Sequence, residues 1–360
     1  MVRSIHFVAG ILILIFIAAI VMGMAVYQPD SHDETKLKVI CAGSLIESFY
    51  EFEKEFENKH PGVDVQVEGH GSIQVIRHVT DLHKEVDVIA VADHSLIPDM
   101  MYPEYADWYI AFATNEMVIA YNNQSKYADE ITSDNWYEIL KRPGVTFGFS
   151  NPMLDSCGYR ALMVTQLAEL HYDDQTIFDD VIACNFDPAI AVNTNNDTCI
   201  VVMPEIFEHK TEKIVIRGGS IQLLAFLDYG EIDYAFQYKS MAQQHGLQFV
   251  DLPSEIDLSS TESEDIYNKV IIQLGFQRFT SVGTERSGKP IFYAMTIPDS
   301  TQHPELAVEF VKFVLSEDGQ IILHNTKIPP IYPMADDPDN IPDELRLMDK
   351  IYGPETFTLL

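Results

Sequence analysis

The sequence predicts an α/β protein made of two units, each an open sheet of mainly parallel strands with helices packed on it. Three observations predict this class. Short apolar strands alternate with amphipathic helices, a second α/β unit follows the first, and 360 residues are enough for about two domains of ~100–200 residues each. The apolar fraction of 47% is ordinary for a globular protein and excludes disorder over most of the length.

The first unit contains three expected strands, at residues 37–42, 63–67 and 86–91, joined by two helices. Between the first two strands, apolar residues three and four apart run from Leu45 to Phe56, which indicates one face of a helix. The third strand is apolar enough to lie in the middle of a parallel sheet. This β-α-β-α-β order is typical of an open α/β sheet.

The second unit repeats the alternation and is interrupted by a polar segment, residues 181–213, which is expected to be irregular. Its strands are expected at 111–121, 147–149, 214–216 and 234–236, and its helices at 136–140, 158–172 and 221–227. Further strands near 268–282 and 290–297 and a helix beginning at Pro304 are expected to follow.

Residues 1–27 are predicted to direct the chain across a membrane. The stretch from Ile5 to Val26 is almost wholly apolar, and Arg3 is the only charged residue before Asp30. Its length lies between the apolar core of a signal peptide, ~7–15 residues, and a spanning helix of ~20. We therefore expect a cleaved signal peptide or an N-terminal membrane anchor, followed by a polar tether at 28–36. Both alternatives place the rest outside the cytoplasm, secreted or anchored to the outer face of the cell membrane.

The formal net charge of −32 restricts the classes of partner. Nucleic-acid binding and adhesion to anionic lipid both need a basic face, so we expect neither. Twelve histidines are scattered, and His78 and His83 do not share a helix face, so structural or surface roles are expected for them. Cys184 and Cys199 flank an Asn-rich turn and are candidates for a disulfide in an exported chain. The four cysteines form no CxxC motif.

Small residues recur where an expected strand ends and a helix begins. The four junctions contain Gly43-Ser44, Gly71-Ser72, residues 155–158 and Gly219-Ser220. A helix N-terminus presents unpaired N–H groups and a partial positive charge, and ligands of open α/β sheets lie at the carboxyl ends of strands. Each junction alone is explained by turn and N-cap chemistry. Four that converge would enclose a small anion without Lys or Arg.

Six strings occur in unbroken order between about Leu37 and Pro330. They are Ala-Gly-Ser-Leu (42–45), Met-Met-Tyr-Pro-Glu (100–104), Asn-Trp-Tyr-Glu-Ile-Leu-Lys-Arg-Pro (135–143), Phe-Gly-Phe-Ser-Asn-Pro (147–152), Cys-Gly-Tyr-Arg (157–160) and Gln-Tyr-Lys-Ser-Met-Ala-Gln-Gln-His-Gly (237–246). With these strings the chain resembles the archaeal tungstate/molybdate-binding proteins of the WtpA/ModA group. The resemblance is specific, because several strings have no general structural meaning.

The resemblance implies a type II periplasmic-binding-protein fold, in which two α/β lobes joined by two crossing segments close over one ligand. Lobe one is then expected to comprise 37–120 and 241–345, lobe two 121–240, and a C-terminal tail 346–360. The implied role is capture of tungstate or molybdate by a monomer outside the cytoplasm. The protein would deliver the oxyanion to an ABC-transporter permease with its ATPase, without a cofactor and without catalysis.

The resemblance also implies a set of ligand-binding residues. Lobe one would contribute hydroxyl and N–H donors, and lobe two would contribute a carboxylate, main-chain N–H groups and further hydroxyls. The set comprises Ser44, Ser72, Asp155, Cys157, Gly158, Ser220 and Tyr238.

Asp155 is unexpected beside a dianion, because a carboxylate repels it. In the family that the chain resembles, a carboxylate in this turn approaches the metal of tungstate or molybdate and raises its coordination above four. A second carboxylate is expected after Ile-Arg, where this chain has Ser220. This difference leaves tetrahedral and octahedral coordination both open. The alternatives for Asp155 are that it caps the following helix or accepts a proton from hydrogen phosphate.

Three other functions are weighed against this one. An enzyme is disfavoured, because Gly-x-Ser-x-Gly and His-Glu-x-x-His do not occur, and the P-loop-like residues 283–290 have a proline in place of the hydroxyl residue. The same fold could instead bind phosphate, sulfate or a small carboxylate. A carboxylate ligand calls for an arginine clamp, and Arg160 and Arg217 are the candidates for it. A surface protein without a transport role would leave the four junctions unexplained.

Overall fold

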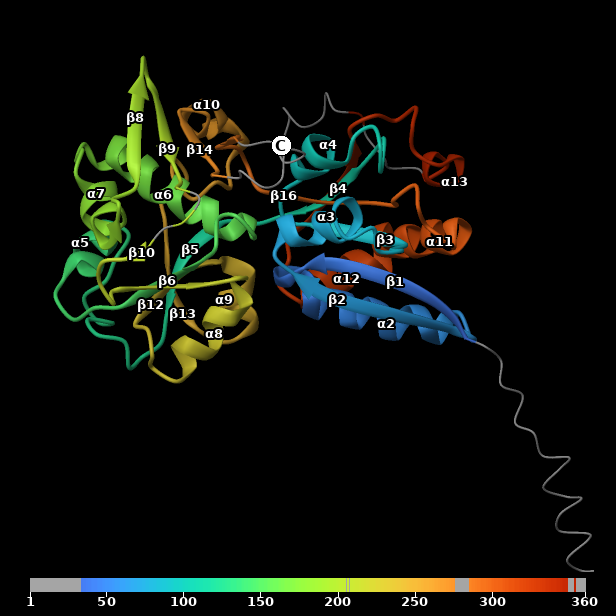
Figure 1. Ribbon diagram of the computed structural model, residues 1–360. Helices are drawn as coiled ribbons and strands as arrows, with labels where there is room; N and C mark the ends of the chain where they lie inside the picture. The colour runs from blue at the N-terminus through green and yellow to red at the C-terminus, as the bar shows by residue number, and fades with distance from the viewer. Residues whose placement is uncertain (1–33, 205, 207, 276–284, 349–352, 354–360) are drawn as a thin grey trace, which may run out of the picture.

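The computed structural model describes residues 34–348 and 353, apart from 205, 207 and 276–284. Figure 1 shows two bodies side by side, the first built from both ends of the described chain and the second from its middle. The predicted segment 1–27, nearly all of the tether and most of the tail lie outside the described residues. Within the described ranges, no helix has both the length and the apolar character needed to cross a membrane.

The first lobe is a six-stranded sheet in the order β17-β4-β16-β3-β1-β2. Strand β1 pairs in parallel with β2 and β3, as predicted, whereas β16 runs antiparallel to β3 and β4. The strands are β1 (Thr35–Ala42), β2 (Val63–His70), β3 (Val88–Val91), β4 (Ile110–Thr114), β16 (Phe292–Thr296) and β17 (Pro330–Ala335). The helices are α2 (Ile46–Lys59), α3 (Ser72–Thr80), α4 (Leu96–Met101), α11 (Pro304–Leu315), α12 (Glu317–Asn325) and α13 (Asp343–Arg346).

Aromatic packing joins two helices of this lobe, α2 and α11. The apolar spacing that predicts α2 places Phe49, Phe52 and Phe56 on its buried face. Phe56 meets Phe310 of α11 edge to face with ring centroids 5.2 Å apart, a favoured geometry for aromatic pairs. The rings of Phe52 and Phe313 meet in the same way at 6.1 Å. These contacts join the N-terminal part of the lobe to its C-terminal part.

The second lobe has a five-stranded sheet in the order β11-β6-β12-β5-β13 and an attached four-stranded sheet in the order β15-β14-β9-β8. Helix α6 is buried nearly all round. The strands of the two sheets are β5 (Met117–Tyr121), β6 (Phe147–Ser150), β11 (Ile214–Arg217), β12 (Tyr234–Tyr238) and β13 (Gln248–Asp251), then β8 (Ala191–Asn195), β9 (Thr198–Val202), β14 (Val270–Gln273) and β15 (Glu285–Ser287). A two-stranded ribbon joins β7 (Phe186–Asp187) and β10 (Glu208–His209). The helices are α5 (Trp136–Lys141), α6 (Ser156–Tyr172), α7 (Ile177–Val181), α8 (Ile221–Asp228), α9 (Lys239–Gln244) and α10 (Glu264–Tyr267), and one-turn 3₁₀ helices occur at Gly43–Leu45, Ala183–Asn185 and Thr261–Ser263.

The lobe boundaries differ from the prediction at the return crossing. The outward crossing lies between β4 and β5, close to the expected residue 120. The return was expected at 241, which assigned 241–345 to lobe one, but β13 pairs with β5 inside the second lobe. The chain re-enters the first sheet only at β16, which begins at Phe292. The error arises because sheet membership of β13 depends on a partner more than a hundred residues away.

The segment 181–213 was expected to be irregular, and this expectation is wrong. It contains β7 to β10, and β8 pairs with β9 through five residue pairs. All of β8 is exposed, so it lacks the alternation of apolar and polar residues by which a strand is recognised. The candidate disulfide between Cys184 and Cys199 is not formed in the structure. Cys184 and Cys199 are both free thiols, and Cys184 Sγ donates to the carbonyl oxygen of Asp180 at 3.3 Å.

A buried carboxyl group lies close to the outward crossing. The main-chain carbonyl of Asp257 accepts the N–H of Met117 at 2.8 Å, where β5 begins. Its Oδ1 accepts the N–H of Ser259 at 2.8 Å. Burial raises the pKa of Asp257 to about 6, although the hydrogen bonds from Ser259 oppose the shift. Ionisation of this group therefore costs the folded state free energy at neutral pH.

We expect the Asp257→Asn variant to gain stability relative to the wild type as pH rises from 4 to 7. In the unfolded chain the carboxyl loses its proton near its ordinary pKa of about 4, whereas the folded protein keeps the proton to about 6. Wild-type stability therefore falls across this window by about 2 kcal/mol, and asparagine removes that loss while its side-chain oxygen still accepts from Ser259. Urea unfolding of both proteins at pH 4, 5, 6 and 7 measures the difference. A difference that stays constant with pH would contradict the expectation.

Candidate functional site

The four predicted junctions converge where the two lobes meet. Ser72 Oγ, in the first lobe, lies 3.2 Å from Ser156 Oγ, in the second. The main-chain N–H of Gln74 donates to the carbonyl of Leu154 across the same gap at 3.3 Å. A Cβ built on Gly43 would lie 3.4 Å from Cγ2 of Ile221, so the fourth junction faces the first. The structure therefore holds the lobes together around these residues.

We define the serine cup as Ser44, Ser72, Ser156 and Tyr238, with Asp155 beside them. All five are buried. Ser44 lies in the turn after β1, and Ser72 opens α3 directly after β2. Asp155 and Ser156 stand where α6 begins, and Tyr238 ends β12. The cup therefore draws on both lobes, and each residue stands at the carboxyl end of a strand or at the start of a helix.

The hydroxyl of Ser156 is linked to Arg160 through Tyr238. Arg160 Nη1 donates to the hydroxyl oxygen of Tyr238 at 2.7 Å, and a guanidinium cannot accept. The Tyr238 hydroxyl lies 3.0 Å from Ser156 Oγ, and either hydroxyl can be the donor of this bond. When Tyr238 donates, Ser156 Oγ accepts and keeps its own proton for Ser72 Oγ or for a ligand. A guanidinium thus polarises a hydroxyl that it does not contact.

Ser44 and Ser72 are arranged in the same way. Asn115 Nδ2 donates to the Tyr293 hydroxyl oxygen at 3.0 Å, and Tyr293 donates in turn to Ser44 Oγ at 3.0 Å. Ser72 Oγ accepts the main-chain N–H of Ala92 at 3.0 Å. In each case the serine oxygen accepts from the protein, which leaves its proton available to donate. One proton of the Ser72 and Ser156 pair lies in the bond between these two hydroxyls, and a ligand that accepts from both would replace that bond.

Asp155 occupies the N-cap position of α6, but its side chain makes no capping bond to that helix. Its Oδ2 instead accepts the main-chain N–H of Ser220 at 2.9 Å, which joins the starts of α6 and α8. Burial raises the pKa of Asp155, and the hydrogen bond from the N–H of Ser220 opposes that shift. The alternative in which Asp155 serves only as a cap does not account for this geometry.

Two predicted donors are already engaged within the second lobe. The N–H of Gly158 donates to the carbonyl of Asp155 at 3.1 Å, and the N–H of Ser220 goes to the Asp155 carboxylate. Cys157 was predicted to donate through its main-chain N–H; its thiol lies 3.7 Å from the carbonyl oxygen of Phe236, and burial raises the pKa of that thiol. Packing requires glycine at position 158, since a Cβ there would lie 2.1 Å from the Ser150 carbonyl oxygen. These residues shape the cup from behind, and a direct ligand contact by any of them remains a prediction.

An interlobe latch, formed by Asp93, Tyr159 and Arg160, closes one side of the cup. The Tyr159 hydroxyl donates to Asp93 Oδ2 at 2.5 Å, and Arg160 Nη2 lies 3.4 Å from the same oxygen. Arg160 Nη1 also donates to the carbonyl of Ala92 at 2.6 Å. Although burial alone raises the pKa of Asp93, Arg160, His94 and the Tyr159 hydroxyl together hold it well below its usual range. The latch is thus an ionised, buried contact between α6 and the segment after β3.

The two arginines proposed as carboxylate clamps do not face a free ligand position. Arg160 is buried and compensated by Asp93. Arg217 donates to the carbonyl of Ile216 at 2.7 Å and lies over the ring of Phe226, with Cζ 4.1 Å from the ring centroid. The geometry therefore disfavours a small carboxylate ligand, which calls for a paired guanidinium.

Sequence reasoning missed Ser156, Asp93, Tyr159, Tyr293 and Asn115 as parts of this site. Ser156 and Tyr159 lie in or next to strings that carried the family resemblance, so that signal was present. The other three lie 40 or more residues from α6 in sequence, and they give no local pattern.

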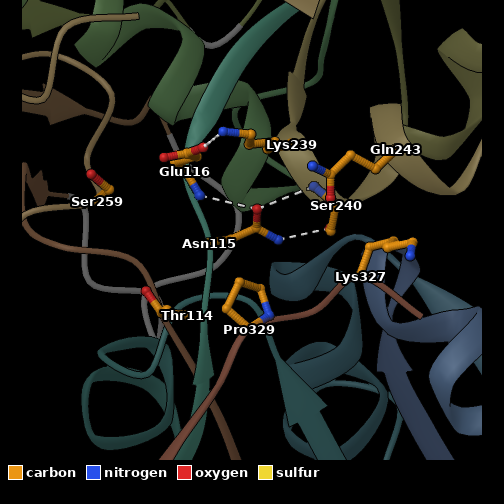
Figure 2. A pocket seen from close by; sticks show the side chains of 9 residues that line it. All are labelled: Thr114, Asn115, Glu116, Lys239, Ser240, Gln243, Ser259, Lys327 and Pro329. Carbon is orange, nitrogen blue, oxygen red and sulfur yellow. Dashed lines mark hydrogen bonds and ion pairs between the residues drawn. The ribbon is translucent and has the colours of Figure 1, made fainter. Parts of the chain in front are cut away.

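A cavity of about 250 Å³ lies at the crossing, separate from the cup (Figure 2). Asn115, between β4 and β5, donates to Ser240 Oγ at 2.7 Å, and its Oδ1 accepts the N–H of Glu116 at 3.0 Å. Lys239, which also lines the cavity, pairs with Glu116 and with Asp251. Since Asn115 also donates to Tyr293, the crossing and the Ser44 hydroxyl share one hydrogen-bond network.

Comparison with known proteins agrees with this architecture. The family model of bacterial extracellular solute-binding proteins matches residues 37–326. A protein of Methanococcus maripaludis strain C5, named an uncharacterized solute-binding protein, is 44% identical over 320 residues, which cover 88% of this chain and 90% of the relative. The molybdate/tungstate-binding protein WtpA of Thermococcus kodakarensis is 40% identical over 351 residues, 94% of each chain.

A solved structure shares the fold at low sequence identity. The sulfate-binding protein SubI of Mycobacterium tuberculosis matches with a TM-score of 0.54 and 13% identity over 90% of this chain and 96% of that one. At this identity the match shows the fold alone. Together with the family match it confirms the predicted two-lobe type II fold, and the relatives confirm the predicted family resemblance.

Proposed function

The chain belongs to the bacterial extracellular solute-binding proteins, and from this premise we propose that it captures one tungstate or molybdate dianion in the serine cup. It then delivers the oxyanion to the permease of an ABC importer, whose ATPase drives transport. A protein in this role binds and releases its ligand unchanged, acts as a monomer and needs no cofactor. It works outside the cytoplasm, either secreted or held at the membrane by residues 1–27.

The three serine hydroxyls that meet in the cup are the observation that carries this proposal. Ser44 and Ser72 each accept a hydrogen bond from the protein and keep a proton to donate. A ligand that accepts from both Ser72 and Ser156 would replace the bond between these two hydroxyls. The oxygens of an oxyanion accept hydrogen bonds from such hydroxyls, whereas a cation or a ligand with only donor groups would meet the hydroxyl protons unfavourably. The N-termini of α3 and α6 add partial positive charge on the same side.

The net charge of −32 is compatible with an anionic ligand of this size. A polyanion needs many basic contacts over an extended face, but one dianion is held by dipoles within a few ångströms. Exposed acidic groups more than about 8–10 Å away are largely screened at physiological ionic strength. They are expected to slow anion capture modestly and leave the closed cup unaffected.

Calorimetry tests the proposal with tungstate, molybdate, sulfate, phosphate and glutamate titrated into the purified full chain. We expect tungstate and molybdate to bind tightly, with one ligand per chain. Tight binding of phosphate or sulfate alone would assign the cup to that oxyanion instead. No heat with any of the four oxyanions would contradict the proposal. Binding of glutamate alone would contradict the conclusion that Arg160 and Arg217 are not placed to bind a carboxylate ligand.

The Asp155→Asn variant tests whether the carboxylate coordinates the metal of the oxyanion. Asparagine keeps an oxygen for the Ser220 N–H but loses the anionic ligand atom. If Asp155 coordinates tungsten, tungstate affinity should fall about 10- to 100-fold, in line with interactions of charged groups worth ~1.5–3 kcal/mol. Sulfate has no expandable centre, so any sulfate affinity should stay constant or rise.

The matched control is Asp228→Asn, which removes the same charge from an exposed position at the far end of α8. We expect its tungstate affinity to equal that of the wild type. If Asp155 only repelled the dianion, Asp155→Asn would bind tungstate more tightly. The two roles therefore predict changes of opposite sign.

A further inference from the structure

One side-chain cluster outside the cup has the composition of a metal site. Glu68, His70 and His78 each offer a ligand atom, and these atoms all lie within 4.8 Å of one another. Glu68 Oε2 and His70 Nε2 are 3.4 Å apart. The rings of His70 and His78 have centroids 4.4 Å apart and meet at 71°. Structural or surface roles were expected for these histidines, because spacing along a single helix does not relate His70 to His78.

The fold explains why the three side chains meet. Glu68 and His70 are two residues apart on β2, so they point to the same face of the strand. β2 is the edge strand of its sheet, and Gly71 turns the chain straight into α3. His78 stands in the last turn of α3, which packs back beside β2. A strand and the helix after it thus present one carboxylate and two imidazoles from the same lobe.

We propose that Glu68, His70 and His78 bind a divalent transition-metal ion of the Zn²⁺ class, with water completing its coordination. Two imidazoles and one carboxylate are an established ligand set for zinc, with metal–ligand distances of about 2.0–2.2 Å. Ligand atoms on a tetrahedron of that size are roughly 3.3–3.5 Å apart. The separation of Glu68 Oε2 from His70 Nε2 already has this value. The ligand atom of His78 lies within 4.8 Å of the other two, so it has to approach them by at most about 1.5 Å.

His78 and Lys84 are placed so that the cluster can accept a metal ion. Among the described residues, His78 Nδ1 is buried without a hydrogen-bond partner. Lys84 Nζ lies 3.7 Å from Glu68 and is about half exposed, so it can turn to solvent when a metal takes the carboxylate.

The site is independent of the proposed oxyanion function. Its three ligands belong to the first lobe alone, so lobe closure and an occupied cup are not required. It lies next to the cup in sequence, because His70 directly precedes Gly71-Ser72. A bound ion would tie β2 to α3 and stiffen the turn that presents Ser72.

The test is calorimetric titration of Zn²⁺ into the untagged, chelator-treated full chain, in a buffer free of tungstate and molybdate. We expect one Zn²⁺ per chain and at least a tenfold loss of affinity in His78→Gln, the usual scale for a removed ligand or its support. The control is His83→Gln, five residues on, where the imidazole stacks on Tyr105 outside the cluster. His83→Gln should bind Zn²⁺ like the wild type.

Thermal unfolding gives a second readout. Zn²⁺ should raise the Tm of the wild type and of His83→Gln but not that of His78→Gln. If His78→Gln does not fold, Glu68→Gln takes its place with the same expectation. No binding to the wild type, or unchanged binding in the folded variants of both ligands, would overturn the proposal. Because oxyanions are absent, either result leaves the proposed transport function untouched.

Discussion

Replacing Gly71 with alanine is expected to keep the lobes apart and to weaken tungstate binding by about 100-fold or more. A Cβ at Gly71 would lie 2.4 Å from the Leu154 carbonyl oxygen and 2.8 Å from Asp155 Cβ, both in the opposite lobe. The Leu154 carbonyl oxygen and carbon belong to the main chain and cannot turn away like a flexible side chain, so the clash is relieved by opening the lobes. The φ of Gly71 is −63°, which alanine adopts without strain, so the first lobe itself should stay folded.

Calorimetry and small-angle scattering together check this expectation. Wild-type protein should become more compact when tungstate is added, and Gly71→Ala should not. The matched control is Gly218→Ala, in the facing junction, where the nearest atom to the new Cβ is Gln222 Oε1 at 3.6 Å. This control should bind and compact like the wild type. Tight binding by Gly71→Ala with the usual compaction would contradict the idea that the closed arrangement is the binding one.

The Asp93→Asn variant is expected to lose roughly 100-fold or more in tungstate affinity by a different route. Asp93 belongs to the first lobe and Arg160 to the second, so their ion pair exists only when the lobes meet. Removing one partner of a buried pair leaves the other charge uncompensated, at about 3–5 kcal/mol. In the open form water would solvate Arg160, so the variant is destabilised only in the closed form. Closure of the lobes, and with it tungstate binding, therefore becomes less favourable.

An exposed ion pair within one lobe provides the control. Arg142 and Glu130 are 2.6 Å apart in the second lobe, and exposed pairs contribute about 0–1 kcal/mol. Glu130→Gln should therefore leave tungstate affinity within a fewfold of the wild type. If Asp93→Asn bound tungstate as tightly as Glu130→Gln, the latch would not contribute to closure. Circular dichroism and the Tm of each unliganded variant separate this effect from loss of folding.

Much of the cup could be predicted because its residues lie at local sequence signals. Ser44, Ser72 and Asp155 stand where a strand ends and a helix begins, and such junctions are read from a few neighbouring residues. The convergence of the junctions follows from the general rule that ligands lie at the carboxyl ends of strands. The two-lobe architecture followed from the family resemblance.

The missed parts depend on distant partners. Tyr293, on β16, and Asn115, between β4 and β5, orient the Ser44 hydroxyl from positions many residues away in sequence, and Asp93 meets Tyr159 from the other lobe. The late return crossing has the same cause, since β13 is assigned by its pairing with β5. The Glu68, His70 and His78 cluster was missed because it joins a strand to a helix, where no single periodicity relates the residues.

The most direct test of the central claim is the position of tungsten in a crystal of the protein grown with tungstate. Anomalous scattering at a tungsten absorption edge identifies the metal without reference to any model of the ligand. We expect one strong peak per chain, enclosed by both lobes and within oxyanion reach of the Ser44, Ser72 and Ser156 hydroxyls. A protein that binds tungstate in solution but shows its tungsten outside the serine cup would contradict the account.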